Sequence, residues 1–205
     1  MTAPLTLHLL RHGAPLISGT FLGHQDMPAT TAGNDQCVAQ AQAAFPAPHA
    51  PDWIMTSDLS RCAGAAQRIA DHYQRPLTSD PRWRELDFGD WDGRTAADID
   101  SDALTRFWQD PDQHRPPQGE SRAALIQRVD AALADMASGT GLIVAHAGSI
   151  RAALHLLLGL PHDHCWSIAI PYAARLTLSL WPDERPAEQR PNQHHWVGQL
   201  KALQP

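Results

Sequence analysis

Two short apolar segments, each followed by a polar triplet that contains glycine, constrain the fold of this chain more than any other feature. Residues 5–10, Leu-Thr-Leu-His-Leu-Leu, precede Arg-His-Gly, and residues 141–145, Gly-Leu-Ile-Val-Ala, precede His-Ala-Gly. Both segments are too short for a buried helix and are dominated by apolar residues, which is typical of buried strands. The sequence therefore predicts a sheet that presents polar residues where its strands end.

Segments with helical periodicity alternate with such strands along the chain. This alternation predicts an α/β fold with a mostly parallel sheet covered on both faces, that is, a three-layer α/β/α sandwich. A length of 205 residues suits one domain spanning 1–205. We expect helices at 30–45, 58–73 (N-capped by Asp58), 97–108, 120–136 and 149–158, strands at 5–10, 52–56, 76–78, 141–145, 166–170 and 174–181, and a polar excursion at 182–195.

Charge and cysteine content argue against several classes of protein. The formal net charge is −6, and Lys201 is the only lysine among 16 basic residues, so no basic surface for nucleic acid is expected. The three cysteines are odd in number and far apart, which makes a disulfide framework improbable. No segment approaches the ~20 apolar residues of a membrane span, and the first ten residues lack the basic region of a signal peptide. We therefore expect a soluble, cytoplasmic protein with no nucleic-acid or membrane partner.

Three polar segments are predicted to meet where strands end. They contribute two guanidinium groups, from Arg11 and Arg61, and two imidazoles, from His12 and His146. Arginine forks match the oxygens of a phosphoryl group, and the helix N-termini that follow these segments favour anions. The sequence therefore predicts a phosphate-binding site at this edge of the sheet.

Four motifs resemble those of the histidine phosphatase (phosphoglycerate-mutase-like) superfamily, and they follow the family's order over roughly residues 5–180. The resemblance implies the phosphoglycerate-mutase-like fold and an enzyme that hydrolyses phosphoric monoesters. The motifs are Arg11-His12-Gly13, Ser57-Asp58-Leu59-x-Arg61, Glu85 within Arg-Glu-Leu-Asp-Phe-Gly-Asp-Trp-Asp-Gly, and His146-Ala147-Gly148.

The resemblance also implies a role for each matching residue. His12 would be the nucleophile that takes the phosphoryl group, with Arg11 and Arg61 binding its oxygens and His146 donating to them. Glu85 would protonate the leaving oxygen and then act as the base for water. A nucleophilic histidine has to be neutral, and flanking arginines favour that form. This chemistry needs no metal and no cofactor, and the expected partner is a small phosphorylated metabolite bound by a monomer or homodimer.

Three other interpretations are weaker. Cys62 and Arg68 match the Cys-x5-Arg pattern of cysteine phosphatases, but such a match arises by chance in about one such chain in five, and Cys62 lies on the apolar face of a predicted helix. The histidines at 162, 164, 194 and 195 lack further ligands at fixed spacing, which is typical of surface histidines rather than a metal site. A non-enzymatic relative would usually have lost the nucleophile or its arginine partners.

The residues after the first motif bear on the substrate. Phosphoglycerate mutases usually follow Arg-His-Gly with Glu-Ser-x-x-Asn, whereas this chain has Ala-Pro-Leu-Ile-Ser, which argues against a mutase. Ser18 replaces the asparagine and is a candidate substrate-binding residue. Two further segments resemble α-ribazole-5′-phosphate phosphatases of cobalamin biosynthesis, and a broad-specificity phosphatase is the alternative. These segments are Phe107-Trp108-x-Asp110-Pro111 leading to residues 116–121, and residues 166–172 followed by Trp196-x-Gly198-x-Leu200.

Overall fold

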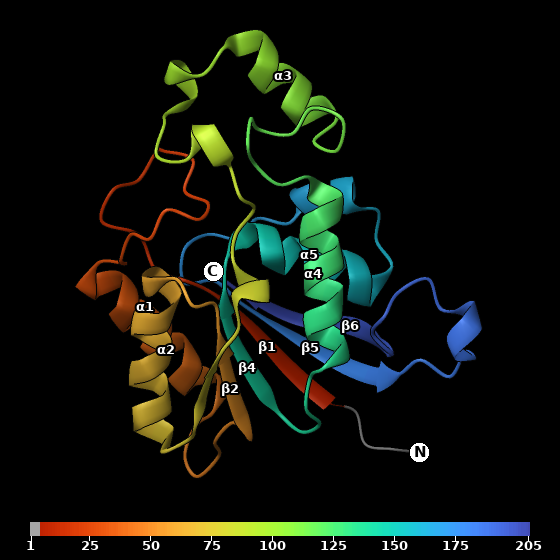
Figure 1. Cartoon of the computed structure of the whole chain (residues 1–205). Coiled ribbons are helices and arrows are strands. Elements are labelled where there is room, and N and C mark those ends of the chain that lie inside the picture. Colours follow the sequence, from red (N-terminus) through yellow and green to blue (C-terminus); the bar gives the residue numbers. More distant parts are fainter. Residues whose placement is uncertain (1–4) are drawn as a thin grey trace.

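The chain forms a six-stranded sheet with helices on both faces. The computed structural model describes residues 5–205, and its strands lie in the order β3-β2-β4-β1-β5-β6 (Figure 1). The strands are β1 (Leu5–Arg11), β2 (Trp53–Thr56), β3 (Leu77–Ser79), β4 (Gly141–Ala145), β5 (Arg175–Pro182) and β6 (Trp196–Gln204). The helices are α1 (Thr31–Ala44), α2 (Ser60–Tyr73), α3 (Ser101–Gln109), α4 (Arg122–Ala134) and α5 (Ala147–Leu158). No helix within residues 5–205 is long and apolar enough to cross a membrane.

Strand pairing confirms the predicted, mostly parallel sheet. β1 pairs in parallel with β4, β4 with β2, and β2 with β3. Only β5 runs in the opposite direction, since it pairs antiparallel with both β1 and β6.

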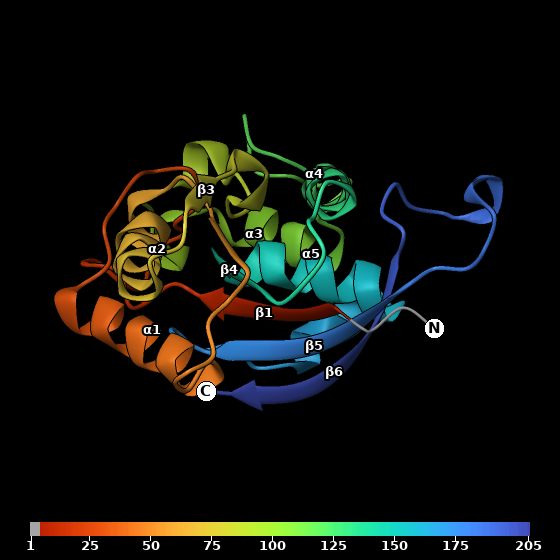
Figure 2. The same ribbon diagram turned by 90° about the horizontal axis from the view of Figure 1, so that it is seen from below.

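Two hydrophobic cores lie on opposite faces of this sheet. Leu9 and Leu10 are neighbours on β1 but belong to different cores, because successive side chains of a strand point to opposite faces. Leu9 packs in the core that includes residues of α4 and α5, whereas Leu10 packs with residues of α1 and α2. Figure 2 shows β4 between α2 and α5. The predicted three-layer α/β/α sandwich is therefore confirmed.

The register of the parallel strands sets their carboxyl ends level. Arg11 on β1 lies opposite Ala145 on β4. The amide of His12 then donates to the carbonyl of Ala145 at 3.0 Å, and the amide of Ser57 donates to the carbonyl of Val144 at 3.0 Å. Hydrogen bonding thus continues past the strand ends and fixes the backbone of the predicted site.

Residues 80–121 form a cap beyond these strand ends. α3 lies at the top of Figure 1, apart from the four helices that cover the sheet. Its Phe107 is buried, and the ring centroid lies 5.5 Å from that of Trp91, which ends the 3-10 helix Gly89–Trp91. Aromatic packing therefore holds α3 in place as one wall above the sheet edge.

The strand predicted at 166–170 is wrong. The chain instead forms a 3-10 helix at His162–Ser167, which begins directly after Pro161. The ring of Trp166 packs over the guanidinium of Arg151 at 4.2 Å. This apolar segment therefore covers polar groups rather than joining the sheet.

β6 was not predicted from sequence. It is an edge strand that pairs with β5 from Pro182↔Trp196 to Arg175↔Gln204. Its outward side chains are exposed and mixed in character, so the strand lacks the apolar run by which buried strands are recognised.

Asp58 does not cap α2 as predicted. The helix begins at Ser60, and its N-cap residue Leu59 makes no side-chain hydrogen bond. The carboxylate of Asp58 instead accepts from Nε of Arg84 at 2.7 Å and from Nη2 at 2.5 Å. A bidentate arginine pair has displaced the capping interaction.

The polar excursion between β5 and β6 is tied to α4 by one buried carboxylate. Asp130 accepts from the amide of Gln193 at 2.7 Å and from the amide of His194 at 2.9 Å. Asp130 is 7% exposed and His194 is 4% exposed, so water cannot replace these bonds without opening the contact.

Replacing Asp130 with alanine should release this excursion. A partly buried amide, that of Gln193, and a buried one, that of His194, would lose their acceptor, and the free energy of unfolding should fall by about 1–3 kcal/mol. Hydrogen exchange should accelerate at Gln193 and His194 while the amides of β4 stay protected. The matched control is Asp135→Ala, which removes an exposed carboxylate of the same region. If both changes altered hydrogen exchange at Gln193 and His194 equally, Asp130 would not be the residue that holds the excursion on α4.

Candidate active site

The Arg-His-Gly motif places the His12 ring between two other rings. Its centroid lies 5.0 Å from that of His146 and 5.5 Å from that of Tyr172. Nδ1 of His12 lies 2.7 Å from the carbonyl oxygen of Gly13. Because that oxygen can only accept, Nδ1 carries the hydrogen and Nε2 keeps its lone pair. The geometry therefore leaves Nε2 free for attack on an electrophile.

The surroundings of His12 favour its neutral form. The residue is 4% exposed, and burial is the main cause that lowers its pKa to about 3. The hydrogen bond to Gly13 acts in the opposite direction, and the charges of Arg11 and Arg61 lower the pKa further. His12 is therefore an unprotonated base near neutral pH.

Close backbone packing explains the glycine of this motif. A Cβ atom on Gly13 would lie 2.2 Å from the carbonyl carbon of Gly33, in the first turn of α1. Any side chain at position 13 would push α1 away from the strand end that carries His12.

Arg11 is held in place but is not fully paired. Its Nη1 donates to the carbonyl of Ile170 at 2.6 Å, and its Cζ lies 4.0 Å above the ring of Tyr172. Its Nε is buried and has no hydrogen-bond partner. Burial lowers the pKa of this guanidinium, while the nearby charge of Glu85 acts in the opposite direction. An anion in front of Arg11 would satisfy the open donor.

The contact between Arg61 and His146 determines which ring nitrogen of His146 carries the hydrogen. Arg61 is fully buried, and its Nε lies 3.2 Å from Nδ1 of His146. Arginine can only donate, so Nδ1 of His146 accepts and the hydrogen resides on Nε2, which lies 2.9 Å from Oγ of Ser57. Burial, followed by the charges of neighbours, lowers the pKa of His146 well below its usual value. The other hydrogen bonds of Arg61 run to backbone carbonyls of residues 22–25, so phosphate binding by Arg61 and His146 stays a prediction.

The carboxylate of Glu85 lies at the N-terminus of α5. Its Oε2 accepts from the amide of Gly148 at 3.0 Å, and its Oε1 accepts from the amide of Leu86 at 2.8 Å. A Cβ on Gly148 would lie 1.9 Å from Oε1, so only glycine admits this carboxylate. The His-x-Gly motif therefore combines a histidine at the N-cap of α5 with the space that Glu85 occupies.

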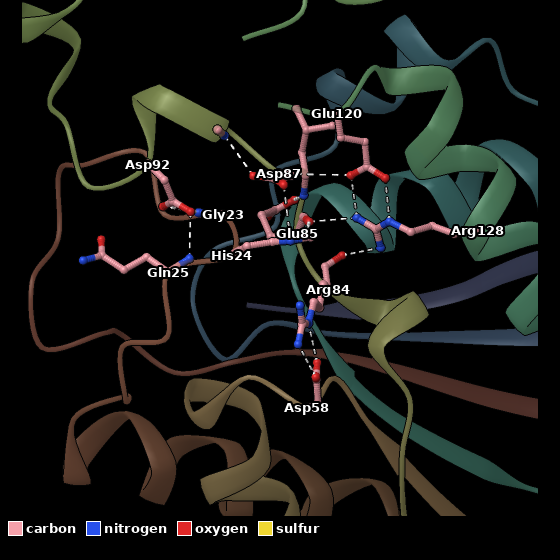
Figure 3. Close-up of polar contacts among 12 residues, drawn as sticks. Gly23, His24, Gln25, Asp58, Arg84, Glu85, Asp87, Asp92, Glu120 and Arg128 are labelled. Atoms are coloured by element: carbon pink, nitrogen blue, oxygen red, sulfur yellow. Dashed lines mark hydrogen bonds and ion pairs between the residues drawn. The ribbon is translucent and has the colours of Figure 1, made fainter. Parts of the chain in front are cut away.

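One ion pair and one carboxylate bound to backbone amides shape the loops around Glu85 (Figure 3). Arg84, the preceding residue, is fixed by its bidentate pair with Asp58. Asp92 accepts from the amides of Gly23 and Gln25 at 2.9 and 2.7 Å. Asp92 therefore organises the loop after β1, whereas Glu85 is the acid in this segment that reaches α5.

A cavity of about 710 Å³ opens in front of part of this site, but His12, Arg61 and His146 are not among the residues that line it. Arg11 and Glu85 line it, as does Arg151, whose Nε is also buried without a partner. Sequence reasoning missed Arg151, although its position three residues after Gly148 on the same helix placed it on the same face. The remaining lining residues are Leu86, Phe88, Phe107, Trp108, Gln109, Pro111, Arg122, Leu125, Ala147, Gly148, Asp163 and Trp166.

Ser18 and Cys62 stand apart from this arrangement. Ser18 is exposed, and within residues 5–205 it forms no hydrogen bond, so its role stays a prediction. Cys62 is fully buried, and burial raises the pKa of its thiol well above the usual value. Cys62 lies on α2, and its Sγ is 3.3 Å from Nε2 of His146. A buried thiol in this state is a poor nucleophile.

Comparison with known proteins decides the family. The sequence profile described as histidine phosphatase superfamily (branch 1) matches residues 7–193. The chain belongs to this superfamily. It is a phosphoric monoester hydrolase, as its curated relatives with phosphatase names also indicate. The resemblance found in the four motifs is thereby confirmed.

Similar proteins differ in the substrates that their names give. A glucosyl-3-phosphoglycerate phosphatase of Mycolicibacterium vanbaalenii is 32% identical over 177 residues, covering 79% of this chain and 77% of the relative. A probable phosphoglycerate mutase GpmB of Yersinia enterocolitica is 33% identical over 168 residues, covering 77% and 76%. A mycobacterial glucosyl-3-phosphoglycerate phosphatase solved with inorganic phosphate has a TM-score of 0.76 at 27% identity, covering 97% and 96%. A putative α-ribazole-5′-P phosphatase of Escherichia coli has a TM-score of 0.79 at 24% identity, covering 97% and 95%, and shares the fold.

Buried neutral histidines should make stability depend on pH. Burial lowers the pKa of His12 to about 3 and, together with the Arg175 charge, that of His8 to about 4; His146 is lowered as well. In the unfolded chain each titrates near 6.5, so stability is full above that pH and falls as the pH decreases. The slope is about 1.4 kcal/mol per pH unit for each histidine.

Urea denaturation in phosphate-free buffer at pH 7, 6, 5.5 and 5 would measure this dependence. Between pH 6 and 5 the three histidines together should remove up to about 4 kcal/mol. His12→Asn should lower the slope by the share of one histidine, about 1.4 kcal/mol per pH unit, whereas the exposed His114→Asn should leave it unchanged. A slope unaffected by His12→Asn would show that His12 is protonated in the folded protein.

Proposed function

We propose that this phosphatase hydrolyses the phosphate monoester of a small metabolite through a covalent phosphohistidine at His12. The observation that carries the proposal is a pair of unpaired guanidinium nitrogens on two arginines that line one cavity. Nε of Arg11 and Nε of Arg151 are both buried without a partner, and both residues line the cavity together with Glu85. An unpaired buried donor costs about 1–3 kcal/mol, and a bound anion removes that cost.

In the first step, the lone pair on Nε2 of His12 attacks phosphorus and the bond from phosphorus to the leaving oxygen breaks. The protonated carboxyl of Glu85 gives its proton to that oxygen, so that a neutral alcohol departs. Arg11 and Arg61 stabilise the negative charge of the equatorial oxygens. His146 donates to the same oxygens through its Nε2 hydrogen, which has to exchange its contact with Oγ of Ser57 for the phosphoryl group.

The second step restores the enzyme. The carboxylate of Glu85 takes a proton from a water molecule whose oxygen attacks phosphorus. The bond from phosphorus to Nε2 of His12 breaks, and its electron pair returns to nitrogen. The sum is a monoester plus water giving an alcohol plus inorganic phosphate. Neither step requires a metal or a cofactor, because guanidinium groups stabilise the charge.

The aromatic wall of the cavity favours a leaving group with a planar ring. Trp108 and Trp166 both line the cavity, and their rings meet edge to face with centroids 5.5 Å apart. Both are about half exposed, so part of each ring is accessible to a ligand, although Arg151 packs against one face of Trp166. These rings support α-ribazole 5′-phosphate, whose leaving group carries a planar aromatic base, as the substrate in cobalamin biosynthesis. A broad-specificity phosphatase remains the alternative.

Arg151 favours a second candidate substrate. Its open donor suits a carboxylate on the leaving group, and glucosyl-3-phosphoglycerate carries one. A relative with 32% identity is named as the phosphatase of that compound. The two candidates therefore differ in whether the rings or the guanidinium recognise the leaving group.

Hydrolysis of a substrate panel in EDTA would test the mechanism and the substrate together. The panel contains α-ribazole 5′-phosphate, glucosyl-3-phosphoglycerate, 3-phosphoglycerate and p-nitrophenyl phosphate. His12→Ala should lower kcat/KM by at least about 10³-fold for every substrate, because the nucleophile is lost. Acid-labile ³²P should label the wild type and not the variant.

The outcomes separate the alternatives. Activity that survives in His12→Ala would overturn the phosphohistidine mechanism. Preference for α-ribazole 5′-phosphate or for glucosyl-3-phosphoglycerate selects between the two named substrates, and similar kcat/KM values across the panel indicate a broad-specificity enzyme. Formation of 2-phosphoglycerate from 3-phosphoglycerate would identify a mutase.

Substitution of Trp108 would test the aromatic wall. Trp108→Ala should reduce kcat/KM for α-ribazole 5′-phosphate by about 2- to 12-fold, since an aromatic stack contributes about 0.5–1.5 kcal/mol. Glycerol 3-phosphate, which has no ring, should be unaffected. The control is Trp181→Ala, which changes an exposed tryptophan on β5. An equal loss of kcat/KM for both substrates would show that the Trp108 ring does not recognise the leaving group.

A further inference from the structure

The guanidinium of Arg128 on α4 holds the backbone that carries Glu85. Its Nη1 donates to the carbonyls of Arg82 and Arg84, both at 2.8 Å, and its Nη2 donates to the carbonyl of Glu85 at 2.8 Å. The two remaining N–H groups bind the carboxylate of Glu120 at 2.7 and 2.9 Å (Figure 3). All five donors of this arginine are therefore used.

Glu120 extends the same contact to the other side of Glu85. Its Oε2 also accepts from the amide of Asp87 at 3.2 Å. Arg128 and Glu120 are 19% and 14% exposed in their side chains, so their ion pair is largely shielded from water. This Arg128–Glu120 pair thus fixes the chain on both sides of the residue proposed as the proton donor.

The segment around Glu85 needs such support because it has no strand or helix of its own. Residues 84–88 lie between two 3-10 helices, Pro81–Trp83 and Gly89–Trp91, and pair with no strand. The side chain of Glu85 meets the amide of Gly148 at 3.0 Å, and a shift of its backbone would break that contact. The carboxyl position consequently depends on the carbonyls that Arg128 binds.

We propose that Arg128, with Glu120, is a positioning residue that sets the carboxyl of Glu85 for proton transfer in both steps of the reaction. Arg128 is not among the residues that line the cavity, so it acts through Glu85 and not on the substrate. The inference rests on the proposed function, in which Glu85 is the general acid and base. Lysine cannot replace it, because an ammonium has three donors and no planar fork.

Leaving-group dependence provides the test. Wild type, Arg128→Lys, Arg128→Met and Glu85→Gln are assayed with an alkyl phosphate, whose alkoxide must be protonated, and with p-nitrophenyl phosphate, whose phenolate leaves without a proton. Both Arg128 variants should lower kcat/KM for the alkyl ester by about 10²-fold. For p-nitrophenyl phosphate, kcat/KM should stay within about threefold of wild type. This ratio reports only the steps up to formation of the phosphoenzyme, in which the phenolate leaves without a proton.

The second step gives an independent readout. Glu85 also activates water, so a displaced carboxyl should slow hydrolysis of the phosphoenzyme. The Arg128 variants should therefore show a burst of p-nitrophenolate and accumulate ³²P-phosphohistidine. The double variant Arg128→Met/Glu85→Gln should lose no more activity toward the alkyl ester than Glu85→Gln alone, since both changes act through the same carboxyl group.

Controls separate positioning from general damage. Arg82→Met removes an arginine of the same region whose side chain pairs with Asp80 and Asp135, and it should leave the ratio of the two substrates unchanged. Equal losses on both esters in the Arg128 variants, or losses additive with Glu85→Gln, would overturn the positioning role while leaving the proposed function intact. A Glu85→Gln variant without leaving-group dependence would refute Glu85 as the acid, and the role of Arg128 with it.

Discussion

The buried guanidinium of Arg61 is the interaction on which the rest of the site depends. It joins α2 to the N-cap of α5 through Nδ1 of His146 and to the loop after β1 through carbonyls of residues 22–25. Within residues 5–205 no carboxylate forms an ion pair with it, so its charge acts on the imidazoles nearby. Burial is the main cause that keeps both imidazoles neutral, and the Arg61 charge adds to it, as nucleophilic chemistry at His12 requires.

The site is a cationic cluster inside an acidic protein. Arg11, Arg61 and Arg151 are all largely buried, and burial lowers the pKa of each guanidinium. Glu85 is the carboxylate whose charge opposes that shift in all three. Arginines outside the cluster, such as Arg84 and Arg128, are balanced by their own carboxylates. Folding therefore leaves an excess of positive charge where the phosphoryl group is proposed to bind, and an anion that binds there stabilises the folded chain.

The sequence was most informative where side-chain chemistry coincided with the end of a strand. The positions of His12 and His146 could be predicted because the short apolar run before each is typical of a buried strand, which places the next residues at the strand's carboxyl end. Arg151 gives no signal of its own, because its role comes from the helix turn that it shares with Gly148. The apolar segment around Trp166 is typical of a strand, but such a segment can equally cover a cavity. β6 and the Asp58–Arg84 pair depend on contacts between distant segments, which local patterns do not reveal.

The unusual scarcity of lysine has a practical consequence. Lys201 carries the only side-chain amine of the chain, and it is exposed on β6 at the edge of the sheet. The proposed site lies where β1 and β4 end, and β5 separates β1 from β6. Amine-reactive chemistry directed at side chains would therefore attach the molecule to a surface or a fluorophore at a single lateral point, with the cavity facing solution.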